Sequence, residues 1–203
     1  GIMVVGFEES LNDSVNKAVE AGIPVVTLDS DLPNSRRVAF VGTGNYDAGY
    51  QGGMKLAELT GGRGKVAVLT KVGQPNLEER VRGYRDALAK HPGIELARVA
   101  DTKSEVPMAA QAAAAALSAI PGLAGIGCVE AAGGAGAATA VKEAGQAGKV
   151  KVVAMDRDND ILTYIRDGII DAAVVQQTML MPWYGLVILY QLNHYNIPIS
   201  SDN

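Results

Sequence analysis

Short apolar runs rich in β-branched residues alternate with longer mixed segments along almost the whole chain. Runs of this kind are typical of strands buried on both faces of a sheet, and the mixed segments have the length of helices. The pattern predicts strands at residues 2–5, 24–28, 38–41, 66–69, 95–100, 125–129, 150–155 and 171–176. It predicts helices near residues 11–21, 46–60, 76–90, 105–119, 134–147, 158–167 and 179–194. Strands that alternate with helices in this way predict an α/β fold with parallel sheets covered by helices on both faces.

Glycines mark the ends of several predicted helices. Gly22, Gly62, Gly145 and Gly168 each follow a last helical turn, where glycine readily adopts the left-handed conformation that ends a helix. The alanine-rich stretch 108–117 predicts one helix packed closely on a sheet, because alanine is the best helix former. The longest apolar stretch, around residues 183–190, is far shorter than the roughly 20 residues that span a bilayer, so we expect a buried helix there.

Composition narrows the class of protein. The chain has 203 residues, of which 48% are hydrophobic and 20% charged, as expected of a soluble globular α/β protein. A net charge of −4 gives no basic surface, so no nucleic-acid partner is expected. Cys128 is the single cysteine and lies in an apolar run, which predicts a core residue and excludes an internal disulfide. His91 and His194 have no second ligand at metal spacing, so the sequence predicts neither a metal site nor a cofactor.

Several predicted strands end in a side chain able to hydrogen-bond a hydroxyl group. Asp29 and Ser30 follow the second strand, and Glu130, Asp156 and Gln176 end later ones. One such residue is an ordinary helix N-cap. Four at equivalent strand ends favour a binding crevice, because ligands of open parallel sheets bind beyond the carboxyl ends of the strands. Carboxylates and an amide suit vicinal hydroxyls, which both donate and accept.

Arg80 adds a cation in the first turn of the predicted helix 76–90. The helix dipole does not favour a positive charge there, so a specific partner is expected. A guanidinium can bond two neighbouring oxygens at once. The alternative is a surface ion pair with Glu78 or Glu79.

Six segments, in order and with natural spacing, resemble the ribose- and galactose-type periplasmic binding proteins. Residues 21–30 (AGIPVVTLDS) look like the strand that carries their sugar-binding Asp, and 149–156 (KVKVVAMD) look like a later strand ending in a ligand Asp. Arg80-x-x-Gly83-Tyr84 is similar to their Arg-x-x-Gly-aromatic helix start. The other three segments resemble their crossover, the strand opening their second lobe, and the strand whose final Gln binds sugar: 41–49 (VGTGNYDAG), 62–69 (GRGKVAVL) and 169–176 (IIDAAVVQ).

The resemblance implies which residues bind. Asp29, Arg80, Asp156 and Gln176 would hydrogen-bond the ligand, and Ser30 would lie beside it.

Two further expected ligand-binding positions depart from the family pattern. Glu130 replaces an Asn of the family, and an additional acidic group favours an amino- or hydroxyl-rich ligand. Thr102 follows Ala100-Asp101, where the family has an aromatic contact.

The resemblance also implies a two-lobed type I periplasmic-binding-protein fold, in which each lobe is a doubly wound parallel sheet. Residues 1–43 would form part of the first lobe, 44–176 the second lobe, and 177–203 would return to the first. The hinge would lie near Thr43–Gly44 and Gln176–Gln177. Because the chain begins inside a predicted strand, we expect the N-terminal part of the first lobe to be missing, about 60 residues at about 30 per βα unit.

The function implied is binding without catalysis. A monosaccharide or related polyol would be held in an interlobe cleft and delivered to the permease of an ABC transporter. Such a protein would be a monomer and would lie in the periplasm or be anchored at the extracellular surface of a bacterium.

Three other functions compete with this interpretation. Gly134-Ala-Gly136 after a strand, with Asp156 about 20 residues later, partly matches a dinucleotide fingerprint, but Thr139 replaces its third glycine and Glu130 would repel a pyrophosphate. The same fold serves as the effector domain of lac-repressor-type regulators and sugar sensors. A hydrolase is least favoured, because no Gly-x-Ser-x-Gly elbow occurs.

Overall fold

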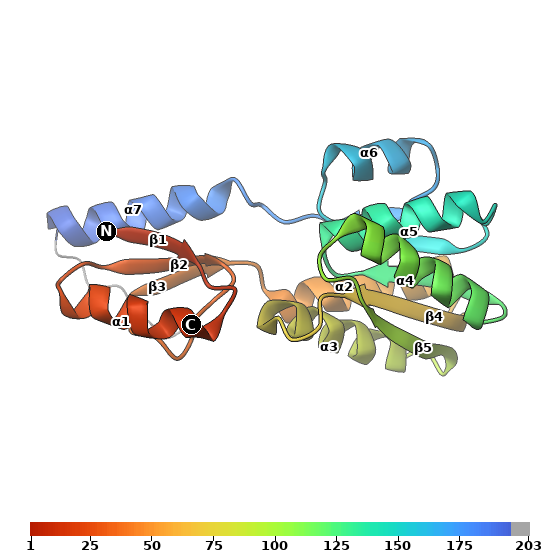
Figure 1. Ribbon diagram of the computed structural model, residues 1–203, viewed down its shortest axis with the longest axis horizontal. Helices are drawn as coiled ribbons and strands as arrows, with labels where there is room; N and C mark the ends of the chain where they lie inside the picture. The colour runs from red at the N-terminus through yellow and green to blue at the C-terminus, as the bar shows by residue number, and fades with distance from the viewer. Residues whose placement is uncertain (196–203) are drawn as a thin grey trace. The chain divides into compact units, whose positions relative to one another are not determined.

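The computed structural model describes residues 1–195, and these divide into two compact units (Figure 1). Unit 1 consists of Gly1–Thr43 together with the described residues from Gln176 onward, and unit 2 is Gly44–Val175. Gln176, expected from the sequence at the end of the second lobe, belongs to unit 1. All predicted strands and helices are present, most with ends within three residues of the prediction.

Unit 2 is an α/β unit whose five strands are all parallel and lie in the order β5-β4-β6-β7-β8. This is the doubly wound arrangement expected from the alternation of strands and helices. Its elements, in chain order, are α2 (Asn45–Leu59), β4 (Arg63–Thr70), α3 (Pro75–Ala89), β5 (Gly93–Asp101), α4 (Val106–Ala119), β6 (Leu123–Cys128), α5 (Ala131–Glu143), β7 (Lys151–Met155), α6 (Asn159–Arg166) and β8 (Ala172–Val174).

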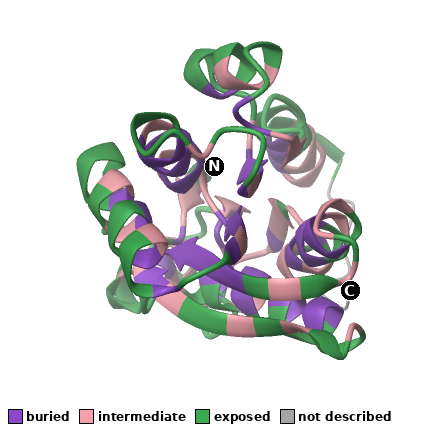
Figure 2. Ribbon diagram, turned by 90° about the vertical axis from the view of Figure 1, so that its right-hand side faces the viewer, coloured by how far each residue is buried: buried purple, intermediate pink, exposed green. Residues whose placement is uncertain are grey.

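Successive residues of β4 pack into two separate hydrophobic cores, one on each face of the sheet. Val66 and Val68 pack in a cluster with residues of α2 and α3. Ala67 and Leu69 pack in a cluster with residues of α4, α5 and α6. The helices of this unit turn buried residues toward the sheet and exposed residues outward (Figure 2). The period of two along a strand therefore explains why this strand is apolar at every position from 66 to 69.

Glycines allow the helices on each face to approach closely. A Cβ on Gly49 would lie 1.9 Å from the Arg80 carbonyl oxygen, and one on Gly83 would lie 2.2 Å from the Tyr46 carbonyl oxygen. These two glycines bring α2 and α3 together. The glycine of the Arg-x-x-Gly motif is thus required by packing.

Unit 1 is a smaller parallel sheet with one principal helix on each face. Its strands lie in the order β1-β2-β3, and α1 and α7 pack in separate clusters against them. The elements are β1 (Ile2–Val5), the 3₁₀ turn η1 (Glu9–Leu11), α1 (Asn12–Glu20), β2 (Val25–Asp29), β3 (Ala39–Gly42) and α7 (Leu180–Tyr195).

The structure corrects three expectations. The helix over 183–190 is not buried all round: α7 buries a stripe with Leu189, while Trp183 and Leu186 are 57% and 58% exposed. Strand β5 lies at a sheet edge and exposes several residues, so it is not covered on both faces. Helix α5 begins at residue 131 instead of 134. None of the described helices is long and apolar enough to cross a membrane.

Candidate functional site

The strand order of unit 2 reverses direction between β4 and β6. From β4 the chain continues to β5 on one side and later to β6 on the other, which makes their carboxyl ends a topological switch point. Crevices at such points are the usual ligand sites of open parallel sheets. Arg80 follows β4 in chain order, Thr102 follows β5 and Glu130 follows β6. Three of the residues predicted from the sequence thus follow neighbouring strands on this side of the sheet.

Arg80 is 3% exposed and is held inside unit 2. Its Nε donates to Asn45 Oδ1 at 2.8 Å, and its Nη1 donates to the Val129 carbonyl oxygen at 2.9 Å. The alternative interpretation of Arg80 as a surface residue paired with Glu78 or Glu79 is wrong, because Arg80 is buried. Since Val129 precedes Glu130, the second bond fixes the guanidinium beside the end of β6.

Glu130 occupies the N-cap position of α5 without acting as a cap. Its side chain makes no hydrogen bond to the first turn of the helix. Its Oε1 instead accepts a hydrogen bond from the Thr102 hydroxyl at 2.7 Å, and Thr102 is fully buried. The N-cap interpretation therefore fails for this side chain, and Thr102 reaches the switch point through Glu130.

The two aspartates predicted at strand ends share an uncommon backbone conformation. Asp29, the last residue of β2, has φ 58°, and Asp156, which follows β7, has φ 73°. A non-glycine residue in the left-handed region is uncommon, and such residues cluster at functional sites. Each unit therefore contains one aspartate in the left-handed conformation at the end of a strand.

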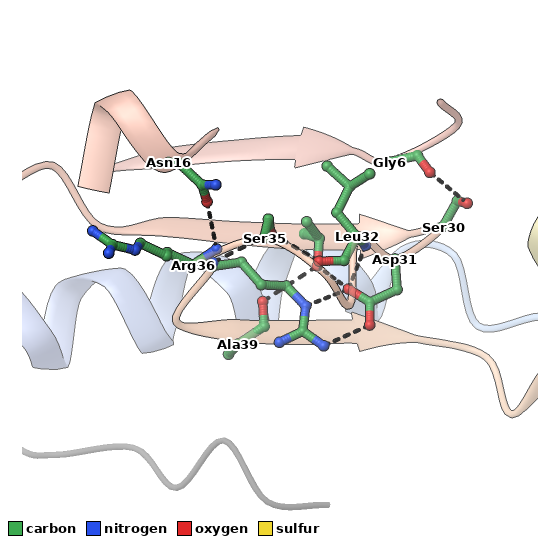
Figure 3. A network of polar contacts seen from close by, with 10 residues as sticks. Gly6, Asn16, Ser30, Asp31, Leu32, Ser35, Arg36 and Ala39 are labelled. Atoms are coloured by element: carbon green, nitrogen blue, oxygen red, sulfur yellow. Dashed lines mark hydrogen bonds and ion pairs between the residues drawn. The ribbon is translucent and has the colours of Figure 1, made fainter. Parts of the chain in front are cut away.

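In unit 1, Asp29 carries a carboxylate oxygen that is shielded but unpaired. Its Oδ1 is buried and has no hydrogen-bond partner among the described residues. Ser30 is nearly fully buried, and its hydroxyl donates to the Gly6 carbonyl oxygen at 2.9 Å (Figure 3). Ser30 therefore fastens the ends of β1 and β2 together, with its hydroxyl already occupied.

A charged clamp that the sequence analysis missed secures the same loop. Asp31 accepts hydrogen bonds from the Thr27 hydroxyl at 2.7 Å and from Arg37 Nη2 at 2.6 Å, and the Leu32 amide also donates to it (Figure 3). Burial raises the pKa of this carboxyl, but hydrogen bonds from the guanidinium, the hydroxyl and the amide outweigh that effect and leave the pKa below its usual range. The close run of charged residues from 31 to 37 was the available signal.

Gln176 is held by Thr43, which was not among the site residues predicted from the sequence. The Thr43 hydroxyl donates to Gln176 Oε1 at 2.7 Å. Thr43 ends the first segment of unit 1 and Gln176 begins its second. Because the carbonyl of the amide faces Thr43, the orientation of the amide is set. Asn45, which bonds Arg80, was missed in the same way.

The glycines that partly match a dinucleotide fingerprint lie inside α5. A Cβ on Gly134 would lie 2.7 Å from Ile161 Cδ1, and one on Gly136 would lie 2.5 Å from Ala109 Cβ. They serve helix packing and form no phosphate-binding loop. Within residues 1–195 no group of His, Cys, Asp and Glu could hold a metal ion. Burial raises the pKa of the Cys128 thiol, which fits a core residue.

The expected site residues thus form two local groups. In unit 2, Arg80, Thr102 and Glu130 are linked around the ends of β4, β5 and β6. In unit 1, Asp29 is the last residue of β2 and Ser30 follows it. A doubly wound sheet with polar residues at its switch point defines a protein built to bind a small polar molecule.

Comparison with known proteins identifies the family. Residues 1–194 match the family model described as periplasmic binding protein domain, and the chain belongs to this family. The comparison with curated proteins gave no significant match.

Solved structures agree closely over nearly the whole chain. A sugar-binding protein of a sugar ABC transporter from Bacillus halodurans is 36% identical with a TM-score of 0.92, covering 99% of this chain and 73% of its own. An arabinose-binding protein from Geobacillus stearothermophilus is 36% identical with a TM-score of 0.88, covering 100% and 70%. An ABC transporter solute-binding protein from Burkholderia graminis, solved with D-arabinose, is 30% identical with a TM-score of 0.93, covering 98% and 71%. The neighbours confirm the two-lobed periplasmic-binding fold class.

Proposed function

We propose that this protein binds a monosaccharide or related polyol and delivers it to an ABC transporter. The observation that carries the proposal is the linked group at the switch point of unit 2. There a buried guanidinium and a carboxylate are held in place by hydrogen bonds from their own unit. A rigid donor beside a rigid acceptor suits a ligand with adjacent hydroxyl groups, each of which donates and accepts.

The proposed ligand contacts are polar side chains at strand ends and one helix start. Asp29, Arg80, Glu130, Asp156 and Gln176 would hydrogen-bond the ligand. Asp29 Oδ1, buried without a partner, supports this, because an unpaired buried oxygen costs free energy that a ligand hydroxyl would recover. The two aspartates would accept from hydroxyls, and the Gln176 amide, oriented by Thr43, would add its NH₂ donor.

The relatives support the biological setting. Proteins in sugar ABC transport and a complex with D-arabinose are among the solved structures at 30% identity or more. They support a solute-binding protein of bacteria, outside the cytoplasmic membrane, whose partner is a permease. They favour this function over the regulator alternative and over an enzyme.

Isothermal titration calorimetry with D-arabinose, D-glucose, D-galactose and D-fucose tests the proposal. At least one sugar should bind the wild-type protein with a saturable heat. Asp156→Asn should weaken that binding about 10-fold or more, because a charged hydrogen bond contributes about 1.5–3 kcal/mol. Asn is tolerated in the left-handed region, so the fold should persist.

Asp167→Asn is the matched control, because Asp167 is exposed and lies at the other end of α6. It should bind as the wild type does. The proposal would be contradicted if none of the four sugars bound the wild-type protein with a saturable heat.

A further inference from the structure

The Thr102 hydroxyl donates a hydrogen bond to the Glu130 carboxylate, and Thr102 has no exposed surface. We infer that Thr102 is a positioning residue: it holds Glu130 Oε1 so that Oε2 is presented to the ligand as a hydrogen-bond acceptor, which selects ligands with an O–H or N–H donor there. This inference rests on the proposed function. It replaces the expected direct contact of Thr102 with an indirect one.

The single proton of the Thr102 hydroxyl has two acceptors within reach. Glu130 Oε1 lies at 2.7 Å and the Thr70 carbonyl oxygen at 3.3 Å. A hydrogen bond to a carboxylate is shorter and stronger than one to a neutral carbonyl, so the proton goes to Glu130. The hydroxyl oxygen also accepts from the Ser104 amide at 3.1 Å, which fixes the direction in which the proton points.

The loop after Thr102 holds this arrangement at a conformational cost. Lys103 and Ser104 have φ of 56° each, two successive non-glycine residues in the left-handed region. Asp101 Oδ1 accepts from the Lys103 amide at 3.0 Å and so stabilises the turn. At the other end, the Thr102 amide donates to the Thr70 carbonyl oxygen at 2.8 Å, which ties the residue to the end of β4. The hydroxyl therefore has little freedom to leave Glu130.

The surroundings of Glu130 indicate that it offers the ligand a hydrogen-bond acceptor and no donor. Among residues 1–195, Oε1 accepts the hydrogen bond from Thr102 and no side chain or amide donates a hydrogen bond to Oε2. Glu130 lines a cavity of about 320 Å³ whose other ionisable side chains are Asp158 and Asp160. The ionisable side chains that line this cavity are all acidic, so a hydrogen-bond donor is favoured there and an anionic substituent is disfavoured.

The consequence is a specific form of selectivity. An amide at position 130 would offer both a donor and an acceptor. The carboxylate held by Thr102 accepts only. One ligand hydroxyl should therefore be coupled to Glu130, and the strength of that coupling should depend on Thr102.

The experiment combines the removal of single sugar hydroxyls with substitutions at Thr102 and Glu130. Calorimetry measures the affinity of each combination. The sugar among D-arabinose, D-glucose and D-galactose that binds most tightly is compared with its monodeoxy derivatives. In the wild type, one deoxy derivative should bind about 10-fold more weakly than the parent sugar. Glu130→Ala should remove that difference at this position alone. Thr102→Val should reduce the same difference, and Thr102→Ser, which keeps the hydroxyl, should retain it.

A second variant keeps the test valid if Thr102→Val unfolds, as circular dichroism would show. In Glu130→Gln the amide oxygen takes the hydrogen bond from Thr102, so the NH₂ faces the ligand. This variant should lose its preference for the parent sugar and bind the O-methyl derivative at that position better than the wild type does. The inference is overturned if no hydroxyl is coupled to Glu130. It is also overturned if Thr102→Val weakens parent and deoxy sugars equally. Absence of wild-type binding to any sugar would instead contradict the proposed function itself.

Discussion

The two units of this protein share one design but differ in how completely they bury it. Each has a parallel sheet, helices on both faces, and an aspartate in the left-handed conformation at the end of a strand. Unit 2 buries both faces of its central strands, whereas unit 1 leaves large apolar side chains of α7 exposed. The polar residues at the strand ends of unit 2 pack against a deeply buried core. Those of unit 1 are supported by the partly exposed clamp at Asp31. The stability of the two units and the rigidity of their candidate site residues should therefore differ.

The largest expected effect compares two leucines. Leu69 is fully buried in the core of unit 2, and Leu186 is exposed on α7 of unit 1. Leu69→Ala should lower the free energy of unfolding by about 2–5 kcal/mol, because it leaves a cavity. Leu186→Ala should change it by less than about 0.5 kcal/mol. Urea unfolding followed by circular dichroism measures both. Equal losses in the two variants would show that α7 is packed as tightly as the core of unit 2.

A second pair of substitutions, at two glycines, compares how well each unit tolerates an added methyl group. A Cβ on Gly49 would lie 1.9 Å from a backbone oxygen of α3, whereas one on Gly185 of α7 would meet the Met3 sulfur at 2.9 Å. Gly49→Ala should cost about 1–3 kcal/mol. Gly185→Ala should be near neutral, since a flexible side chain moves and alanine gains about 1 kcal/mol of helix propensity. Urea midpoints decide, and a stable Gly49→Ala would contradict the close approach of α2 and α3.

A smaller effect concerns the pH dependence of the clamp in unit 1. Because the folded pKa of Asp31 is lowered, its stabilisation is present above the unfolded value of about 3.9 and is lost as the pH falls through the folded value. Asp31→Asn should reduce stability by about 1–2 kcal/mol at neutral pH, and this loss should shrink as the pH falls below about 3.9. The fluorescence of Trp183, the single tryptophan and a residue of unit 1, reports this unfolding. The same loss at both pH values would mean that the charge of Asp31 contributes nothing.

The sequence predicted the order of strands and helices well because each strand is locally apolar and each helix ends at a recognisable glycine or turn. It failed for α7, whose composition resembles a buried helix although only one face is covered. Periodicity reports what a segment is able to bury and does not report what covers it.

The candidate site was predictable only in part, for a physical reason. Asp29, Glu130 and Asp156 follow apolar strands and were visible as strand ends. Thr43 and Asn45 hold Gln176 and Arg80 from positions 133 and 35 residues away in the chain, so no local pattern reveals them. The hydrogen bond from the buried Thr102 hydroxyl to Glu130, 28 positions away, likewise depends on a contact that only the fold brings together.

The central claim is the proposed one that the left-handed aspartates at strand ends, Asp29 and Asp156, each hydrogen-bond the sugar. Calorimetric titration of Asp29→Asn in unit 1 and Asp156→Asn in unit 2, with the sugar that binds the wild type most tightly, tests it most directly. Both substitutions keep shape and tolerate the left-handed backbone, so any loss reports the carboxylate. Each variant should bind about 10-fold or more weakly than the wild type, with unchanged thermal unfolding. Wild-type affinity in either variant would contradict the account.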